Sequence, residues 1–257
     1  MRFGSRSSPS KSVDEENPYW MSFSDVMSGL LVIFILASVI LILQLMVKQE
    51  EIDESKVEFE AEIELLKQAE EVRRNILIVA AETLKARGIQ VEISENETVL
   101  RIPNDLLGFS TGQDDIQTRY EATAFEIGQV LFTLINKDDR VNFLDTIFVE
   151  GHTDSRPFSG ALCGDKGNWC LSSLRAISLW QFWESELPTD QRLSEFDNLA
   201  GQPLFSVSGY AATRPVVANE QSEDEYRQNR RIDIRFTIRR PSSEDYQRVR
   251  SQLVEVL

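Results

Sequence analysis

The sequence predicts a mixed α+β domain that follows a single membrane-spanning helix and a helical stalk. Three observations lead to this prediction. Residues 26–43 carry no charged side chain. Residues 48–87 contain neither proline nor glycine and are rich in Glu, Lys, Leu and Ala, which favour helix. From residue 90 onward, short apolar runs of strand length alternate with longer segments of helical pattern.

The apolar run VMSGLLVIFILASVILIL is long enough to cross a membrane. As a helix it spans roughly 27 Å, close to the thickness of the hydrocarbon core of a bilayer. Tyr19 and Trp20 precede it, and aromatic residues favour the membrane interface. The run exceeds the apolar core of a signal peptide, and no small-residue cleavage site follows it. We therefore expect a retained membrane helix over residues 20–47, after a tail over residues 1–19.

Basic residues are distributed with a slight bias toward a cytoplasmic N-terminus. Arg2, Arg6 and Lys11 precede the apolar run, whereas Lys48 and Lys56 follow it closely. Because lysine and arginine favour the cytoplasmic side, the tail is expected in the cytoplasm.

One acid, Asp25, stands at the start of the apolar run. Carboxylates inside membranes are costly and often mark ion pathways, so Asp25 is a candidate ion-coupling residue. A single helix offers no shielded path across a bilayer, so this role requires partner helices. The alternative is that Asp25 marks the membrane edge or caps the start of the helix.

Residues 48–88 are expected to form the stalk, with Gly88 ending its helix. A heptad phasing gives apolar seam positions at some turns and polar positions at others, so the coiled-coil signal is moderate. A solvated acidic helix fits the segment equally well. The apolar positions are Ile52, Phe59, Ile63, Leu66 and Leu77, and the polar positions are Lys56, Glu70 and Arg73.

Residues 89–257 are expected to form an α+β domain in which most strands are separated by helices. In chain order we expect a hairpin of Val91–Ile93 and Thr98–Ile102, a helix Tyr120–Ile135, a strand Leu144–Glu150, a helix Leu171–Leu187, strands Leu204–Ser208 and Ile232–Ile238, and a final helix Ser242–Val256.

Composition excludes some classes of function. The net charge of −15 argues against nucleic acid as a partner, because phosphate binding needs a basic surface. Two cysteines and one histidine are too few for the usual four-ligand zinc site, so we expect no metal site. Cys163 and Cys170 have the spacing of a small loop disulfide in an oxidising compartment, but the sequence leaves open whether they are bonded.

The single histidine, His152, stands close to Asp154 and Ser155, a combination that is also found in hydrolases. No nucleophile elbow accompanies these residues. In an extended strand, His152 and Asp154 would share a face and Ser155 would point away. We therefore expect His152 to pack and hydrogen-bond, and we expect no catalytic residues and no enzyme.

Four segments resemble a known family when they are taken together. VEGHTDSRPFSG, NWCLSSLRA, SVSGYAATRPV and NRRIDIRF occur in order over roughly residues 90–240. They resemble the OmpA-like peptidoglycan-binding domain, and most of all its MotB-type version. The resemblance implies a βαβαββ periplasmic domain that binds the cell wall.

The same resemblance implies a ligand site for the diaminopimelate of the peptide stem. The matching residues are Asp154 in GHTD, for the amino group, and Arg175 in LSSLRA, for the carboxylate. Thr153 is expected beside the site. The alternative is that Asp154 and Arg175 form only a surface ion pair.

The NRR element at the start of the last strand lines the same pocket in the resembled family. We expect Asn229 to be a pocket residue, more than Arg230 or Arg231. The insert between Asp154 and Asn168 shapes the rim of the pocket.

The membrane segment extends the resemblance. WMSFSDVMSGLLVIF followed by a glutamate-rich stalk resembles ZorB-type subunits, the MotB-like subunits of Zorya anti-phage defence systems. Flagellar MotB subunits more often have a basic tail, whereas this tail balances its charges. The resemblance implies an inner-membrane location, a second copy of the chain, a MotA-like (ZorA-like) partner subunit and peptidoglycan.

The resemblance implies no cofactor, with protons as the coupling ion and Na⁺ as an open alternative. A flagellar stator subunit and a passive, peptidoglycan-tethered membrane anchor are the alternative functions.

Overall fold

The structure, a computed structural model, describes residues 18–240 except residues 95, 111 and 161–162. The expected final helix Ser242–Val256 and nearly all of the expected tail over residues 1–19 lie outside the described residues. The chain divides into two compact units, with the boundary between Phe59 and Glu60.

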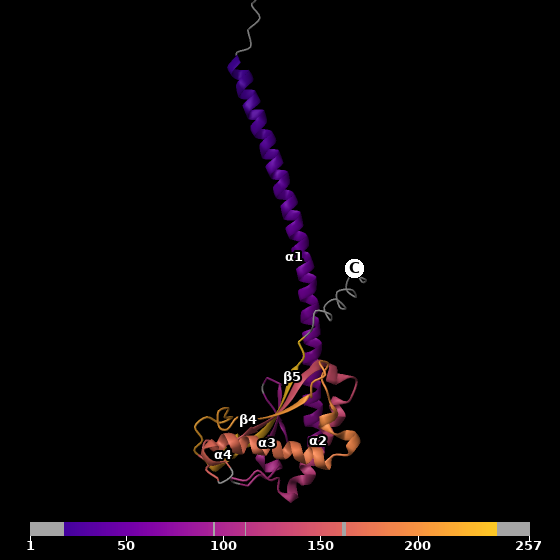
Figure 1. Cartoon of the computed structure of the whole chain (residues 1–257), viewed down its shortest axis with the longest axis vertical. Coiled ribbons are helices and arrows are strands. Elements are labelled where there is room, and N and C mark those ends of the chain that lie inside the picture. Colours follow the sequence, from indigo (N-terminus) through magenta and orange to yellow (C-terminus); the bar gives the residue numbers. More distant parts are fainter. Residues whose placement is uncertain (1–17, 95, 111, 161–162, 241–257) are drawn as a thin grey trace, which may run out of the picture. The chain divides into compact units, whose positions relative to one another are not determined.

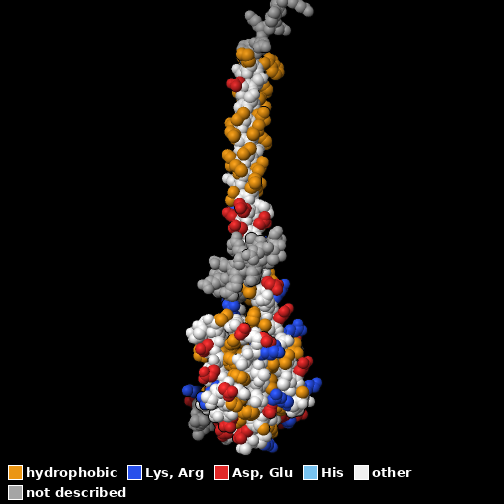
Figure 2. Space-filling model, turned by 90° about the vertical axis from the view of Figure 1, so that its right-hand side faces the viewer, with side chains coloured by type: hydrophobic (Ala, Val, Ile, Leu, Met, Phe, Trp, Pro, Cys, Tyr) orange, Lys and Arg blue, Asp and Glu red, His pale blue; other side chains and the backbone are white. Residues whose placement is uncertain are grey.

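Helix α1 covers Pro18–Ala86 (Figure 1). Among the described residues, its N-terminal part is the one segment long and apolar enough to cross a membrane, by length and composition. The apolar side chains there are exposed, and Figure 2 shows them covering the visible side of the helix. Asp25 lies several residues inside α1, so it does not cap the helix as one alternative required.

The end of α1 has a local cause in the sequence. Gly88 follows the helix with φ +82°, a left-handed backbone conformation that glycine adopts without steric cost. The helix therefore ends close to the predicted position.

The C-terminal unit contains a five-stranded sheet with the order β1-β2-β5-β3-β4. The β3–β4 pair is parallel, and the other neighbouring pairs are antiparallel. The strands are β1 (Glu92–Ile93), β2 (Val99–Pro103), β3 (Leu144–His152), β4 (Phe205–Gly209) and β5 (Arg231–Ile238).

Within the described residues, three further α-helices and five short 3-10 helices connect the strands. The α-helices are α2 (Thr118–Ile135), α3 (Gly167–Glu186) and α4 (Glu223–Asn229). The 3-10 helices are Asn104–Leu106, Arg140–Phe143, Gly164–Lys166, Thr189–Gln191 and Leu193–Glu195.

The predicted α+β class is confirmed, and β2, α2, β3, α3, β4 and β5 follow one another in the predicted βαβαββ order. The bounds of these strands and of α2 differ from the prediction by one or two residues, and the differences at α3 and α4 are larger. Helix α3 begins at Gly167, ahead of the expected Leu171, and α4 was not expected. Asn168 and Trp169 have modest helix propensity, so the sequence pattern placed the start of α3 too late.

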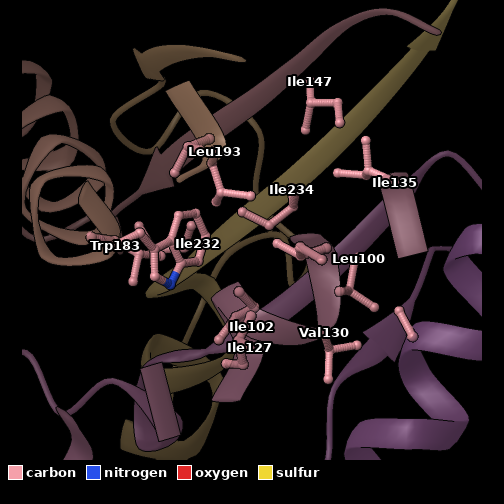
Figure 3. Close-up of a cluster of buried hydrophobic side chains, with 14 of the residues drawn as sticks. Leu100, Ile102, Ile127, Val130, Ile135, Ile147, Trp183, Leu193, Ile232 and Ile234 are labelled. Carbon is pink, nitrogen blue, oxygen red and sulfur yellow. The ribbon is translucent and has the colours of Figure 1, made fainter. Parts of the chain in front are cut away.

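The core lies between one face of the sheet and the helices. Successive strand residues point to opposite faces, so Ile232, Ile234 and Phe236 of β5 enter the core together. Ile127 of α2 and Trp183 of α3 are fully buried in the same cluster (Figure 3). The Trp183 indole N–H donates to the carbonyl oxygen of Ala124 at 2.8 Å, which links α3 to α2.

Candidate functional site

A cleft of about 270 Å³ lies beside the end of β3 and the start of α3. Its walls come from four separate parts of the sequence: the loop before α2, the segment after β3, the first turns of α3, and the residue between α4 and β5. The lining residues are Gly112, Thr153, Asp154, Arg156, Pro157, Phe158, Asn168, Leu171, Arg175 and Arg230.

A glycine in β3 sets how closely α3 approaches the sheet. A Cβ atom on Gly151 would lie 1.8 Å from the carbonyl oxygen of Ser172, so any side chain there would push α3 away. Arg175 lies one turn after Ser172 on α3, and Asp154 follows β3. The close packing at Gly151 therefore brings the two charged side chains to one cleft.

Asp154 is buried and is paired with two arginines. Its Oδ2 accepts from Nη1 of Arg230 at 2.6 Å and from Nη2 of Arg156 at 2.7 Å. Its Oδ1 accepts from the backbone N–H of Arg156 at 3.2 Å. Burial alone would raise the pKa of Asp154, but the hydrogen bonds and charges of Arg156 and Arg230 outweigh it and lower the pKa.

Both arginines also bind Glu223, the first residue of α4. Glu223 Oε1 accepts from Arg230 Nη2 at 2.7 Å, and Oε2 accepts from Arg156 Nη1 at 2.9 Å. Asp154, Arg156, Glu223 and Arg230 thus form a ring in which positive and negative groups alternate.

Arg175 is buried, with 3% of its surface exposed, and its guanidinium has no carboxylate partner among the described residues. Its Nε donates to the carbonyl oxygen of Gln113, and its Nη2 donates to that of Ser110, both at 3.0 Å. Burial lowers the pKa of Arg175 to about 10, and the nearby charge of Arg230 adds to the effect. The group is therefore a fixed cation at neutral pH.

One side chain and one disulfide hold the cleft in place. Asn168 donates from Nδ2 to the carbonyl oxygens of Arg156, at 2.9 Å, and Asp154, at 3.3 Å. Cys163 and Cys170 are joined by a disulfide, with their Cα atoms 5.5 Å apart. Because Cys170 belongs to the first turn of α3, the disulfide ties the segment after β3 to that helix.

Thr153 lies beside Asp154 in the wall of the cleft. Its backbone N–H donates to the carbonyl oxygen of Ala211 at 2.9 Å. Its Oγ1 is buried and has no hydrogen-bond partner among the described residues. The structure thus places Thr153, Asp154, Arg175 and Arg230 in one cleft, although Asp154 and Arg175 do not form an ion pair with each other.

Asn229, which was expected to line the pocket more than the arginines, is not among the residues that line the cleft. Asn229 is fully buried beside the cleft, and its Oδ1 accepts from the backbone N–H groups of Val216 and Val217 at 2.6 and 3.0 Å. Its Nδ2 donates to the Val217 carbonyl oxygen at 2.8 Å and to Glu220. Its side-chain amide is occupied in holding the loop before α4, and Arg230 reaches the cleft instead.

Arg156 and Glu223 complete the charged ring and were missed by the sequence reasoning. Arg156 lies within the segment VEGHTDSRPFSG but was not singled out there, and Glu223 follows it by 67 residues. The available signal was the capping box at Ser222 and Glu225, which marks the start of a helix near the cleft.

A second charged cluster lies on the sheet face opposite the core. Glu150, His152 and Asp233 bring ligand atoms within 4.8 Å of one another, a geometry that could hold a metal ion. Arginines already pair with both carboxylates: Arg235 binds Glu150 through two hydrogen bonds of 2.8 and 2.9 Å, and Arg231 binds Asp233 at 3.0 Å. These cations disfavour a metal ion, so the cluster is better suited to bracing the sheet.

His152 is nearly completely buried in this cluster and stacks on Tyr210, with ring centroids 5.5 Å apart. Burial lowers its pKa to about 2, and the charges of Arg231 and Arg214 add to this effect. Neither ring nitrogen of His152 has a hydrogen-bond partner within the described part of the chain. The Ser155 hydroxyl therefore does not bind the imidazole.

No protein-family model matches the chain. Among curated proteins, the chain is similar to the uncharacterized protein YtxE of Bacillus subtilis (strain 168), at 30% identity over 136 residues. That match covers 53% of this chain and 47% of YtxE, so it spans about half the length of this relative.

Several solved structures are similar to the chain. A MotB-like protein from Desulfovibrio vulgaris has 18% identity, covers 68% of this chain and 99% of its own, and has a TM-score of 0.48. The cell wall anchor of the T6SS from Pseudomonas aeruginosa has 20% identity, and the match covers 63% of this chain and 97% of that structure, with a TM-score of 0.45. The periplasmic domain of Helicobacter pylori MotB has 21% identity, and the match covers 65% of this chain and 90% of that structure, with a TM-score of 0.37.

Proposed function

We propose that this chain is the peptidoglycan-anchoring subunit of a proton-driven motor in the bacterial inner membrane, and that it acts in anti-phage defence. One observation carries the anchoring role. Asp154 and Arg175, which come from two separate family-like motifs, line one cleft. The resemblance implies that both residues bind the same ligand.

The chemistry of the cleft suits an amino acid with a free carboxylate. Arg175 offers a rigid guanidinium without a carboxylate partner among the described residues, which suits a ligand carboxylate. Asp154 is the nearby anion for the nitrogen on the same carbon of the ligand. Diaminopimelate in the peptide stem of peptidoglycan has this pair of groups.

The motor role belongs to the apolar part of α1. The proposed complex places this segment and that of a second copy within a ring of MotA-like subunits. Asp25 then takes up and releases protons as they cross. A membrane potential supplies about 2.3 kcal/mol per elementary charge for every 100 mV, which drives the partner ring. The defence role rests on the resemblance of WMSFSDVMSGLLVIF and the acidic stalk to ZorB-type subunits.

Phage plating on cells that carry the complete native locus tests the proposal. We compare the wild type with Asp25→Asn, which removes the titrating group, and with Asp25→Glu, which retains one, at matched membrane levels. The proposal predicts that Asp25→Asn abolishes protection while the complex still assembles. Protection by Asp25→Asn equal to the wild type would favour a passive wall anchor. If the wild type gives no protection but restores motility in a stator-deficient strain, the chain is a flagellar stator subunit.

A further inference from the structure

We infer that Phe158 selects the ligand of the cleft by its carbon chain. Phe158 forms an apolar wall for the short run of methylene groups that carries the amino acid end bound by Asp154 and Arg175. In peptidoglycan, diaminopimelate has such a run between its two amino acid centres. The inference rests on the proposed function and adds a specificity-determining residue to that site.

The cleft has an apolar side in addition to its charged groups. Its larger apolar lining residues are Pro157, Phe158 and Leu171. Leu171 and Arg175 lie one turn apart on α3, so they share a face of that helix. A ligand whose carboxylate binds Arg175 therefore extends past apolar side chains. The cleft of about 270 Å³ is smaller than the pockets of ~300–1,000 Å³ that hold drug-sized ligands, so it suits one amino acid side chain rather than a disaccharide.

Two glycines hold the ring of Phe158 in place. A Cβ atom on Gly112 would lie 2.8 Å from Cε2 of the ring, and one on Gly160 would lie 2.5 Å from Cζ. Both distances are shorter than real Cβ contacts, so any other residue at either position would push the ring away. Gly112 belongs to the loop before α2 and Gly160 to the segment after β3. The ring therefore packs against two separate parts of the chain.

The start of α3 fixes the backbone that carries this ring. A Cβ atom on Gly167 would lie 2.9 Å from the carbonyl oxygen of Phe158. Gly167 also has φ +48°, a backbone conformation that favours glycine. Asn168 donates from Nδ2 to the carbonyl oxygen of Arg156 at 2.9 Å. A side chain that is already fixed loses little conformational freedom when a ligand binds, so its contacts add to affinity.

An apolar wall discriminates between ligands because it offers no hydrogen bond. Phe158 is half-buried, so part of its surface remains available to a ligand. Methylene groups gain free energy when they leave water for such a surface. A polar atom in the same position loses its hydrogen bonds to water without replacement. Phe158 should therefore favour a methylene chain over a chain of equal length that contains an oxygen atom.

Isothermal titration calorimetry on the full chain in detergent micelles tests the inference. One probe is a stem tripeptide that ends in diaminopimelate. The other is the same tripeptide with an ether oxygen in place of the middle methylene group of the diaminopimelate chain. The variants are Phe158→Ala and Phe158→Gln, which keeps part of the volume, so that a fold defect in one does not decide the outcome. Trp169→Ala is the control, because Trp169 is an exposed aromatic residue of α3 that is not among the residues lining the cleft.

The wild type and Trp169→Ala should bind the methylene probe about fivefold more tightly than the ether probe, the effect of burying about one methylene group. In both Phe158 variants the two dissociation constants should differ by less than about twofold, because the apolar wall is lost. Circular dichroism shows which variants are folded. A wild type without this preference, or a folded Phe158 variant that keeps it, would overturn the inference.

Sedimentation with intact sacculi separates this inference from the proposed function. If the wild type sediments with sacculi but binds neither probe, or binds both equally, the anchoring role stands and the assignment to Phe158 is wrong. If the wild type neither sediments with sacculi nor binds the probes, both proposals fail.

Discussion

His152 is the only histidine of the chain, and its imidazole is 1% exposed between Glu150 and Asp233. Burial keeps it neutral in the folded protein, with a pKa of about 2, whereas the ordinary value is 6.5. Below pH 6.5 the unfolded chain therefore binds a proton at this residue that the folded chain does not bind. The free energy of unfolding must then fall as the pH falls below 6.5.

We predict that the free energy of unfolding of the C-terminal unit decreases by about 2 kcal/mol between pH 7.5 and pH 5 because of His152. Urea titrations followed by tryptophan fluorescence measure it, since Trp183 is fully buried in this unit. His152→Gln does not titrate and should lose most of this pH dependence, even if it is less stable throughout. An equally steep dependence in His152→Gln would show that other groups cause it.

Asn229 is predicted to be a structural residue. Asn229→Ala leaves two backbone N–H groups and the Val217 carbonyl oxygen without their partner, so it should lower the free energy of unfolding by about 2–4 kcal/mol. Below the unfolding transition, the folded variant should bind sacculi as the wild type does. Normal stability combined with lost binding would instead make Asn229 a ligand contact.

At the scale of elements, helix α4 carries Glu223 and so holds Arg156 and Arg230 beside Asp154. A capping box fixes the start of α4. The Ser222 side chain accepts a hydrogen bond from the backbone N–H of Glu225, and the Glu225 side chain accepts one from the backbone N–H of Ser222. Ser222→Ala should destabilise the C-terminal unit by about 1 kcal/mol. Urea denaturation measures this, with Ser222→Asp as a control that retains a cap. Equal stability of Ser222→Ala and the wild type would contradict the prediction.

The Cys163–Cys170 disulfide ties the segment after β3 to the first turn of α3. A cross-link that closes so short a loop stabilises by about 2–3 kcal/mol in the chain-entropy model. A reductant should therefore lower the free energy of unfolding of the wild type by this amount. It should have no effect on the Cys163→Ala/Cys170→Ala double variant. A wild type that does not respond to the reductant would contradict the prediction.

The sequence allowed most of the sheet to be predicted, because local patterns specify it. Ile232, Ile234 and Phe236 alternate with charged residues, and this period of two fixes both the strand and its buried face. Helix α4 was missed because it has only seven residues, too few to show a helical period. In the cleft, the motifs located Asp154 and Arg175. The link between Arg156 and Glu223 joins residues far apart in sequence, so no local pattern specifies it.

At the scale of the whole molecule, the two compact units have different proposed tasks. The N-terminal unit carries the exposed apolar segment of α1 and Asp25. The C-terminal unit carries the cleft with Asp154 and Arg175. Each task is tested by residues of its own unit: variants of Asp25 test ion coupling, and variants of Arg175 test attachment to the wall.

The most direct test of the central claim is sedimentation of the full chain, in detergent, with purified sacculi. We compare the wild type with Arg175→Ala, with Arg175→Lys, which keeps the charge but loses the planar guanidinium, and with Arg227→Ala as a surface control. Circular dichroism shows which variants are folded. We predict that the wild type and Arg227→Ala sediment with sacculi, and that folded Arg175 variants bind at least about tenfold more weakly. A folded Arg175→Ala or Arg175→Lys protein that sediments as the wild type does would contradict the claim that this cleft binds peptidoglycan.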